Sequence, residues 1–367
     1  MKGTGAMELV LENVDRIVGG EIHLKDINLA FSSGSRYVML GRTLAGKTSL
    51  LRVIAGLDPP TTGKVLVDGK DVTGVSVRKR SIAMVYQQFV NYPSLTVFNN
   101  IASPLKVSGA DSDEIDRRVR HTAEMLRIDP FLDRLPAELS GGQQQRTAIA
   151  RALVKETDLL LLDEPLVNLD YKLREELRIE LQEIFERRSA IVIYTTTEPT
   201  EALMLGGNTI VMDEGRVLQE GSTPHVYHHP ASVKVAEVFS DPPVNFISAS
   251  VQGGEAGIGG DIRFPLPGHM KDLEAGEYLF GIRPNHLTIK SKAEGDITIQ
   301  GKVELAEING SETFIHTRCH DAPLVVQEEG VFNYKIGSAV SVHTQPDQFY
   351  VYDASRNLVA APPNITV

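Results

Sequence analysis

Residues 37–49 read Tyr-Val-Met-Leu-Gly-Arg-Thr-Leu-Ala-Gly-Lys-Thr-Ser: an apolar run, then glycine, four residues and Gly-Lys-Thr. The apolar run is typical of a buried strand, and a helix is expected to start near Lys47. Glycines let the backbone curl so that successive N–H groups point at one anion, and the helix dipole adds positive charge. The stretch therefore predicts a cradle for the phosphates of a nucleoside triphosphate. Its expected binding residues are Gly41, Arg42, Thr43, Leu44, Ala45, Gly46, Lys47, Thr48 and Ser49.

Composition limits the class of protein. The chain has 367 residues, enough for two domains, and its formal net charge of −11 gives nucleic acid no electrostatic footprint. We therefore expect no nucleic-acid partner. The single cysteine, Cys319, cannot form an internal disulfide, which fits a reducing compartment. The most apolar short run, residues 159–162, is far shorter than a membrane span, so any membrane role is expected to come through partner proteins.

The sequence pattern divides the chain into two domains. Residues 1–7 look like a cloning remnant, because a second methionine precedes the first strand-like run. From residue 8 to 240, short apolar runs alternate with amphipathic segments, which is typical of a parallel sheet wrapped by helices. From residue 241 to 367, short alternating runs separated by turn residues predict a mostly β domain. In the first domain, strands are expected at 36–40, 81–86, 157–162, 190–195 and 208–212, and helices at 111–126 and 171–188.

Two adjacent carboxylates end an apolar strand. Asp163 and Glu164 follow a run of four leucines, and open α/β sheets place their ligands at that end of their strands. Asp163 is expected to hold Mg²⁺ through water, together with the hydroxyl of Thr48. Glu164 is expected to polarise a water molecule for in-line attack on the γ-phosphate. An Asp-Glu pair alone would be read as a solvated turn, but after a phosphate cradle it favours catalysis.

A second anion site is predicted at a second helix N-terminus. Ser140, Gly141, Gly142 and Gln143 open a helix with free N–H groups. The alternative is a purely structural role, in which the serine only caps the helix N-terminus. The cradle and this helix start are two anion sites in one chain, which instead suggests that one triphosphate is bound between two such helix ends.

These motifs, in this order, resemble the ATP-binding-cassette ATPases: the cradle, Gln87 after a strand, Leu-Ser-Gly-Gly-Gln at 139–143, and Leu-Leu-Asp-Glu-Pro at 161–165. The resemblance implies a P-loop α/β fold that binds ATP and Mg²⁺. It also implies that two cassettes dimerise head to tail, so that residues 140–143 complete the site on the other subunit. Gln87 would then sense Mg²⁺ or the attacking water.

The resemblance narrows to carbohydrate importers. Residues 84–102 look like their glutamine loop and helical subdomain, which is expected at about 88–155 and docks transmembrane permease subunits. Residues 245–247 and 281–287 resemble their β-rich regulatory domain, OB-like and of the TOBE type. This implies a peripheral protein at the cytoplasmic face of the inner (plasma) membrane, linked indirectly to an external substrate-binding protein. Arg283-Pro284 is expected to form a structural turn.

Two positions depart from the family pattern. The family places a histidine after the fifth core strand, in contact with the γ-phosphate, and here Thr197 occupies that place. Loss of one transition-state donor costs about 10²–10³ in rate, so the site on this chain's own cradle is expected to be slow. Near the start, the family stacks an aromatic residue on adenine, where this chain offers Val18. The loss of that platform costs about 1–3 kcal/mol.

The elements contributed to a partner are unaltered, including Asn168-Leu169-Asp170. This asymmetry predicts pairing with a second, non-identical ATPase, and the alternative is a homodimer in which Glu164 suffices. The motifs are also compatible with a largely non-hydrolytic regulatory subunit. A cassette that acts on nucleic acid or ribosomes would instead carry paired cassettes and basic linkers, neither of which is seen. The cradle variant and Thr-Thr-Glu-Pro at 196–199 resemble glycerol and polyol importers, so the transported substrate is expected to be a sugar or polyol, such as glycerol or glycerol-3-phosphate.

Overall fold

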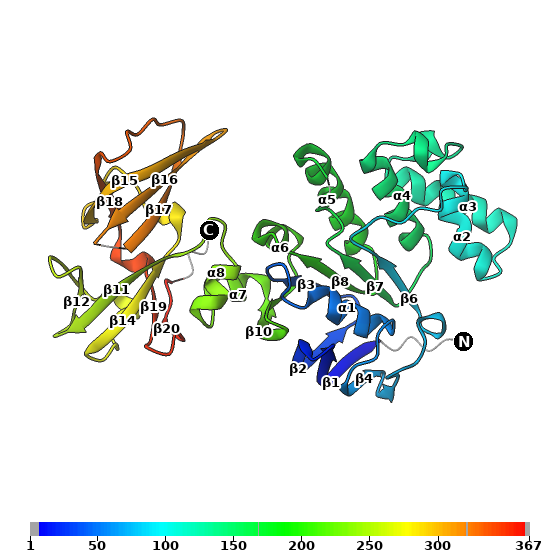
Figure 1. The fold of residues 1–367 in the computed structure, drawn as a ribbon, viewed down its shortest axis with the longest axis horizontal. Helices are drawn as coiled ribbons and strands as arrows, with labels where there is room; N and C mark the ends of the chain where they lie inside the picture. The colour runs from blue at the N-terminus through cyan, green and yellow to red at the C-terminus, as the bar shows by residue number, and fades with distance from the viewer. Residues whose placement is uncertain (1–6, 168, 321, 364–367) are drawn as a thin grey trace. The chain divides into compact units, whose positions relative to one another are not determined.

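The computed structural model describes residues 7–167, 169–320 and 322–363, so Asn168 lies outside the described residues. The chain forms two compact units that divide between Thr223 and Pro224 (Figure 1). The sequence pattern places this division later, near residue 241. The reason for the difference is helix α8 (Val233–Val238), whose buried Val233 and Ala236 cluster with apolar side chains of the β-rich unit.

A six-stranded sheet forms the centre of the first unit, in the order β10-β9-β3-β8-β7-β6. Strand β3 pairs in parallel with β8 and β9, and β7 pairs in parallel with β6 and β8. The carboxyl ends of these strands therefore share one edge. The expected strands and the α/β class are confirmed. The bounds are β3 Arg36–Leu40, β6 Ile82–Val85, β7 Leu159–Asp163, β8 Ile191–Thr196, β9 Asn208–Asp213 and β10 Arg216–Ser222.

A second, four-stranded sheet completes this unit. Its strands are β1 Glu8–Val18, β2 Glu21–Ser32, β4 Thr62–Val67 and β5 Lys70–Asp71, in the antiparallel order β2-β1-β4-β5. One buried apolar cluster joins side chains from this sheet, from the central sheet and from helix α1 (Lys47–Ala55). Leu9 and Phe31 come from the antiparallel sheet, and Met39 and Ile193 from the central one. Helix α1 is thus fixed by core packing directly after the cradle.

The remaining helices of the first unit are amphipathic, and several carry side-chain caps. One example is α3, which begins where Asp111 accepts from the backbone N–H groups of Asp113 and Glu114. The bounds are α2 Val97–Val107, α3 Ser112–Met125, α4 Gly141–Leu153, α5 Tyr171–Glu186 and α6 Pro199–Leu205, with 3₁₀ turns at Val77–Lys79, Asp129–Phe131 and Pro136–Glu138. Helices α2, α3 and α4 lie within the expected helical subdomain.

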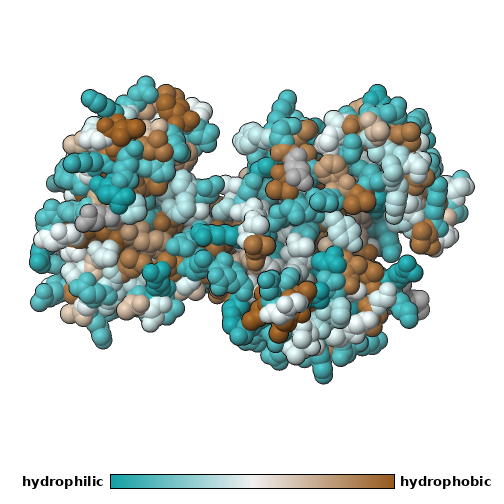
Figure 2. Space-filling model, in the orientation of Figure 1, coloured by the Kyte–Doolittle hydropathy of each residue, from teal (hydrophilic) through white to brown (hydrophobic). Residues whose placement is uncertain are grey.

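No helix in the described parts of the chain combines the length and the apolar character needed to cross a bilayer. Figure 2 shows that the face it draws is largely hydrophilic, with separate smaller hydrophobic areas. Neither observation alters the expectation that membrane contact comes through partners.

The second unit is built from short antiparallel strands, as its turn-rich sequence predicts. Two short helices precede them, α7 (Thr223–His228) and α8. One sheet has the order β13-β12-β11-β14-β19-β20 and the other β17-β16-β15-β18. The strands are β11 Asn245–Gln252, β12 Glu255–Ile258, β13 Ile262–Pro265, β14 Gly276–Ile282, β15 Ile297–Asn309, β16 Glu312–Cys319, β17 Ala322–Glu329, β18 Ala339–Thr344, β19 Tyr350–Tyr352 and β20 Leu358–Ala360. Further 3₁₀ turns are Gly268–Met270, Pro284–His286 and Pro346–Gln348.

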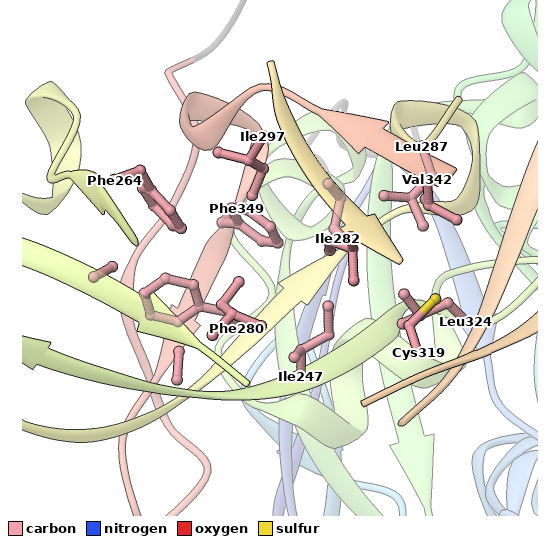
Figure 3. Close-up of a cluster of buried hydrophobic side chains, with 14 of the residues drawn as sticks. Ile247, Phe264, Phe280, Ile282, Leu287, Ile297, Cys319, Leu324, Val342 and Phe349 are labelled. Atoms are coloured by element: carbon pink, nitrogen blue, oxygen red, sulfur yellow. The ribbon is translucent and has the colours of Figure 1, made fainter. Parts of the chain in front are cut away.

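The core of the second unit joins side chains from both of its sheets (Figure 3). Phe264, Phe280 and Phe349 pack against one another, and the sulfur of Cys319 lies near Leu324. Arg283 is also buried in this unit. Its guanidinium lies 3.7 Å from the Tyr227 ring centroid and donates to backbone carbonyls, a structural role of the kind the sequence favours.

Candidate active site

A cleft of about 460 Å³ opens at the phosphate cradle. Its volume is within the range usual for small-molecule sites. All the cradle residues from Thr43 to Ser49 line it, and Gln87 and Glu164 join them from the ends of β6 and β7. The remaining lining residues come from the start of β2: Glu21, Ile22 and His23. The structure thus brings together most of the residues that the sequence assigns to one site.

The cradle backbone adopts left-handed conformations at Leu44 and Gly46, with φ of 69° and 99°. A Cβ added at Gly46 would lie 2.9 Å from the His23 carbonyl oxygen and 3.1 Å from the Cα of Gly215. Glycine is therefore required there by both conformation and space. At Leu44 the left-handed conformation costs about 1–2 kcal/mol, and the side chain is 94% exposed. The cradle is held in this shape by its surroundings.

Replacing Gly46 by alanine is expected to distort the cradle and abolish tight nucleotide binding. The matched control is Gly34→Ala, where φ is also positive at 72° but nothing lies within 4 Å of the added Cβ. Both variants should lose about 1–2 kcal/mol of unfolding free energy from backbone strain, and only Gly46→Ala should also lose Mg-ATP binding by calorimetry. Equal binding by the two variants would contradict this interpretation.

Lys47 is the buried cation of the site. It is 4% exposed, and its Nζ donates to the carbonyls of Gly41 at 2.7 Å and Arg42 at 3.1 Å. These two residues do not line the cleft, but they orient the lysine that does. The Nζ also lies 3.1 Å from Glu164 Oε1. A buried charge needs a partner, and a phosphate entering the cleft can take the place of Glu164.

Asp163 is buried at the end of β7. Its Oδ1 accepts from the hydroxyls of Thr48 at 2.9 Å and Thr195 at 3.0 Å. Burial raises the pKa of Asp163, the two hydroxyl bonds oppose the rise, and the charge of Glu164 adds to it. A bound divalent cation would favour the ionised form.

The donor set suits Mg²⁺. Magnesium prefers oxygen ligands and is usually held by one or two protein groups, substrate phosphates and water. The carboxylate of Asp163, the hydroxyl of Thr48 and the amide oxygen of Gln87 are donors of this kind. Within the described ranges, no group of three or more His, Cys, Asp or Glu side chains gathers as a metal site. A magnesium ion here would therefore depend on the phosphates of its nucleotide.

Glu164 and Gln87 are in direct contact. The amide Nε2 of Gln87 donates to Glu164 Oε2 at 3.1 Å. The backbone at Glu164 is left-handed, with φ of 43°, and its N–H donates to the Thr195 hydroxyl at 2.9 Å. Thr197 follows β8 and lines a small cavity with Glu164. The three residues predicted to be catalytic thus lie at one edge of the sheet.

The predicted signature residues begin helix α4 and do not line the cleft. The Ser140 hydroxyl accepts from the Gln143 backbone N–H at 3.3 Å, and the Gln143 side chain accepts from the Ser140 N–H at 2.9 Å. A Cβ at Gly142 would lie 2.8 Å from a methyl carbon of Leu173, whereas Gly141 faces open space. Ser140 is thus a true N-cap, and these residues do not contribute to the cleft of their own chain.

The region expected to hold adenine differs from the sequence expectation. Val18 ends β1 and is 43% exposed, and it is not among the residues that line the cleft. Ile22, 54% exposed, lines it instead, as does His23, whose Nδ1 lies 3.3 Å from the Ser49 hydroxyl. Sequence reasoning missed these two residues. The only signal was the tight turn after Val18, which pairs Ile22 with Ile17 across the hairpin.

Comparison with known proteins gives two family matches. The ABC transporter family matches residues 24–167 and the TOBE domain matches residues 280–351. The sn-glycerol-3-phosphate import ATP-binding protein UgpC of Cupriavidus pinatubonensis is 35% identical over 95% of this chain and 97% of that protein. The maltose/maltodextrin import ATP-binding protein MalK of Yersinia pestis is 36% identical over 94% of this chain and 95% of that protein.

Solved structures agree for the first unit. A dimeric ATP-binding cassette bound to ADP and Pi is 31% identical, covers 59% of this chain and 98% of its own, and has a TM-score of 0.53. The cbiO1 subunit from Clostridium perfringens is 29% identical, covers 60% of this chain and 90% of its own, and has a TM-score of 0.55. These matches confirm the P-loop α/β fold with a C-terminal TOBE domain. The chain belongs to the ATP-hydrolysing subunits of the ABC transporter family.

Proposed function

We propose that this chain hydrolyses ATP to energise import of a sugar or polyol through transmembrane permease subunits. The observation that carries the proposal is one cleft in which the cradle, Lys47, Gln87 and Glu164 come together. The printed names of the relatives, which are import subunits for glycerol-3-phosphate and maltose, support the substrate class. The protein would then act as a peripheral subunit at the cytoplasmic face of the inner membrane, with an external binding protein delivering the substrate.

The chemistry follows from the positions of the side chains. The cradle amides and Lys47 hold the terminal phosphates. Thr48, Gln87 and Asp163 would hold Mg²⁺, which when bound would supply positive charge to the phosphates. Glu164 takes up a proton from a water molecule as the water oxygen bonds to the γ-phosphorus and the bond to the β-γ bridging oxygen breaks. The products are ADP and phosphate. Such transfer needs positioning and charge stabilisation more than covalent chemistry.

Adenine has an aliphatic platform in this proposal. Ile22 lies in the cleft, and Val18 lies beyond it on the same hairpin. An aliphatic surface buries the base but lacks the stacking of an aromatic ring, which is worth about 1–3 kcal/mol. We therefore expect weaker nucleotide binding than an aromatic residue would give.

A second ATPase subunit completes the assembly in our proposal. Residues 140–143 stand at a capped helix start outside their own cleft, which supports their donation to a partner's site. Thr197 offers a hydroxyl in place of an imidazole, which supports a slow site on this chain. A homodimer is the second candidate, in which Glu164 suffices as the base and Thr197 positions the attacking water.

Transport is tested by deleting this subunit and measuring uptake of labelled glycerol, glycerol-3-phosphate and maltose. We expect uptake of one of these to stop, and to return with the wild-type chain but not with Glu164→Gln. Unimpaired uptake of all three would contradict the proposed substrate class. Normal uptake of the affected substrate with Glu164→Gln would contradict hydrolysis at this site.

Pairing is tested by coexpressing the tagged chain with candidate second ABC ATPase subunits from the same organism. We expect the second ATPase to be recovered in equal amount, with turnover well above that of the isolated chain. Thr197→His should raise turnover of the isolated chain by about tenfold or more, because it adds a transition-state donor. Brisk ATP hydrolysis by the isolated wild-type chain would favour the homodimer.

A further inference from the structure

A small polar cavity lies behind the candidate catalytic carboxylate. It holds about 10 Å³ and is lined by residues from the ends of β7 and β8 and from α6: Glu164, Val167, Thr196, Thr197, Glu198 and Glu201. A space of this size admits one water molecule, and a water is retained where two to four polar partners surround it. Five of the six lining residues carry polar side chains. The cavity therefore has the size and chemistry of a single-water site.

The far wall of this cavity is a buried hydrogen-bonded network. Tyr194 and Glu201 are 2% and 4% exposed, and the Tyr194 hydroxyl donates to Glu201 Oε2 at 3.0 Å. Burial raises the pKa of Glu201, and hydrogen bonds from Thr196 and Tyr194 oppose the rise. The neighbouring Glu198 is paired with Arg174. A buried carboxyl group is costly to keep, and this one stands directly beside the catalytic edge.

The near wall is Glu164, whose side chain is 13% exposed. Its Oε1 is paired with Lys47 and its Oε2 accepts from Gln87. Phosphates entering the cradle compete for the Lys47 ammonium, and Glu164 Oε1 then loses its partner. A carboxylate oxygen left without a hydrogen bond in so enclosed a place is unfavourable. A water in the cavity can replace that bond without any movement of the backbone.

We propose that this cavity binds one structural water that donates to Glu164 and Glu201 and accepts from the Thr197 hydroxyl. The water and Thr197 together hold Glu164 in the orientation needed to activate the attacking water. Thr197 and Glu201 are thus positioning residues. The inference rests on the proposed role of Glu164 in hydrolysis.

The first test is a high-resolution crystal structure of the full chain and of Thr197→Val, which keeps the side-chain shape but loses the hydroxyl. We expect a water about 2.6–3.2 Å from the Glu164 carboxylate and from the Thr197 hydroxyl. We expect it to be absent or displaced in Thr197→Val and retained in Thr197→Ser. A dry cavity in the wild type, or the same water in Thr197→Val, would overturn the proposal.

The second test is kinetic and separates positioning from folding. Thr197→Val should lower kcat about fivefold to tenfold, the value of one hydrogen bond, with KM and the melting temperature unchanged. Thr197→Ser, which keeps the hydroxyl, should retain a higher kcat than Thr197→Val. Glu201→Gln, which keeps the shape of the side chain, should lose less activity than Glu201→Met. If Lys47→Ala abolishes hydrolysis but Thr197→Val does not slow it, the water site fails and the proposed function stands; if hydrolysis is insensitive to Lys47→Ala, the proposed function fails.

Discussion

Glu164→Gln is expected to lower ATP turnover by about 10²–10⁴, the usual contribution of a general base. Glutamine keeps the shape of the side chain but cannot take a proton from water. Mg-ATP should bind at least as tightly as before, because Glu164 no longer competes with phosphate for Lys47, which it now contacts at 3.1 Å. The measurement is steady-state phosphate release together with calorimetry.

The matched control for this variant is Glu124→Gln, an exposed glutamate on helix α3, outside the cleft. It should leave both turnover and binding unchanged. Turnover that survives Glu164→Gln in purified protein would show that another group activates water.

Lys47→Ala is expected to weaken Mg-ATP binding by about 10²-fold or more. Each hydrogen bond to a charged group contributes about 1.5–3 kcal/mol, and the buried ammonium is placed to make more than one. The same change also leaves Glu164 without its cation. The measurement is calorimetric titration with Mg-ATP, and Lys106→Ala, at an exposed lysine on helix α2, is the control.

Folding must be separated from binding in this experiment. In Lys47→Met/Glu164→Gln, both charges of the pair are removed, so that neither buried charge is left without its partner. We expect this double variant to match the wild type in unfolding free energy within about 1 kcal/mol, and still not to bind nucleotide. Recovery of binding in the double variant would mean that Lys47 acts through stability alone.

In the first unit, the strands of the central sheet were predictable, because this sheet is buried on both faces. The four leucines of β7 and the run before the cradle read as strands because nothing polar interrupts them. The antiparallel sheet that includes β1 and β2 was not specified, although its residues supply much of the same core. The pairing of β1 with β4 joins segments about fifty residues apart, such as Leu11 with Val65, and no local pattern encodes that partner.

The residues of the candidate site also divide into those that the sequence predicts and those that it does not. The cradle and the carboxylates were predictable because local geometry fixes their chemistry: a loop that needs glycine, and a strand that delivers two acids at its end. Ile22 and Glu201 were not, because their places depend on which elements meet at the cleft and at the small cavity. A hairpin brings Ile22 to the cleft, and a buried tyrosine on β8 holds Glu201 behind it.

The most direct measurement is a crystal structure of the Glu164→Gln chain with Mg-ATP. We predict terminal phosphates within about 2.7–3.2 Å of Lys47 Nζ and the cradle N–H groups, with Mg²⁺ beside Thr48 and Asp163 and a Ser140 helix start from another subunit on the far side. A nucleotide bound elsewhere, or a cradle still occupied only by the lysine and residue 164 at saturating Mg-ATP, would contradict this mechanism.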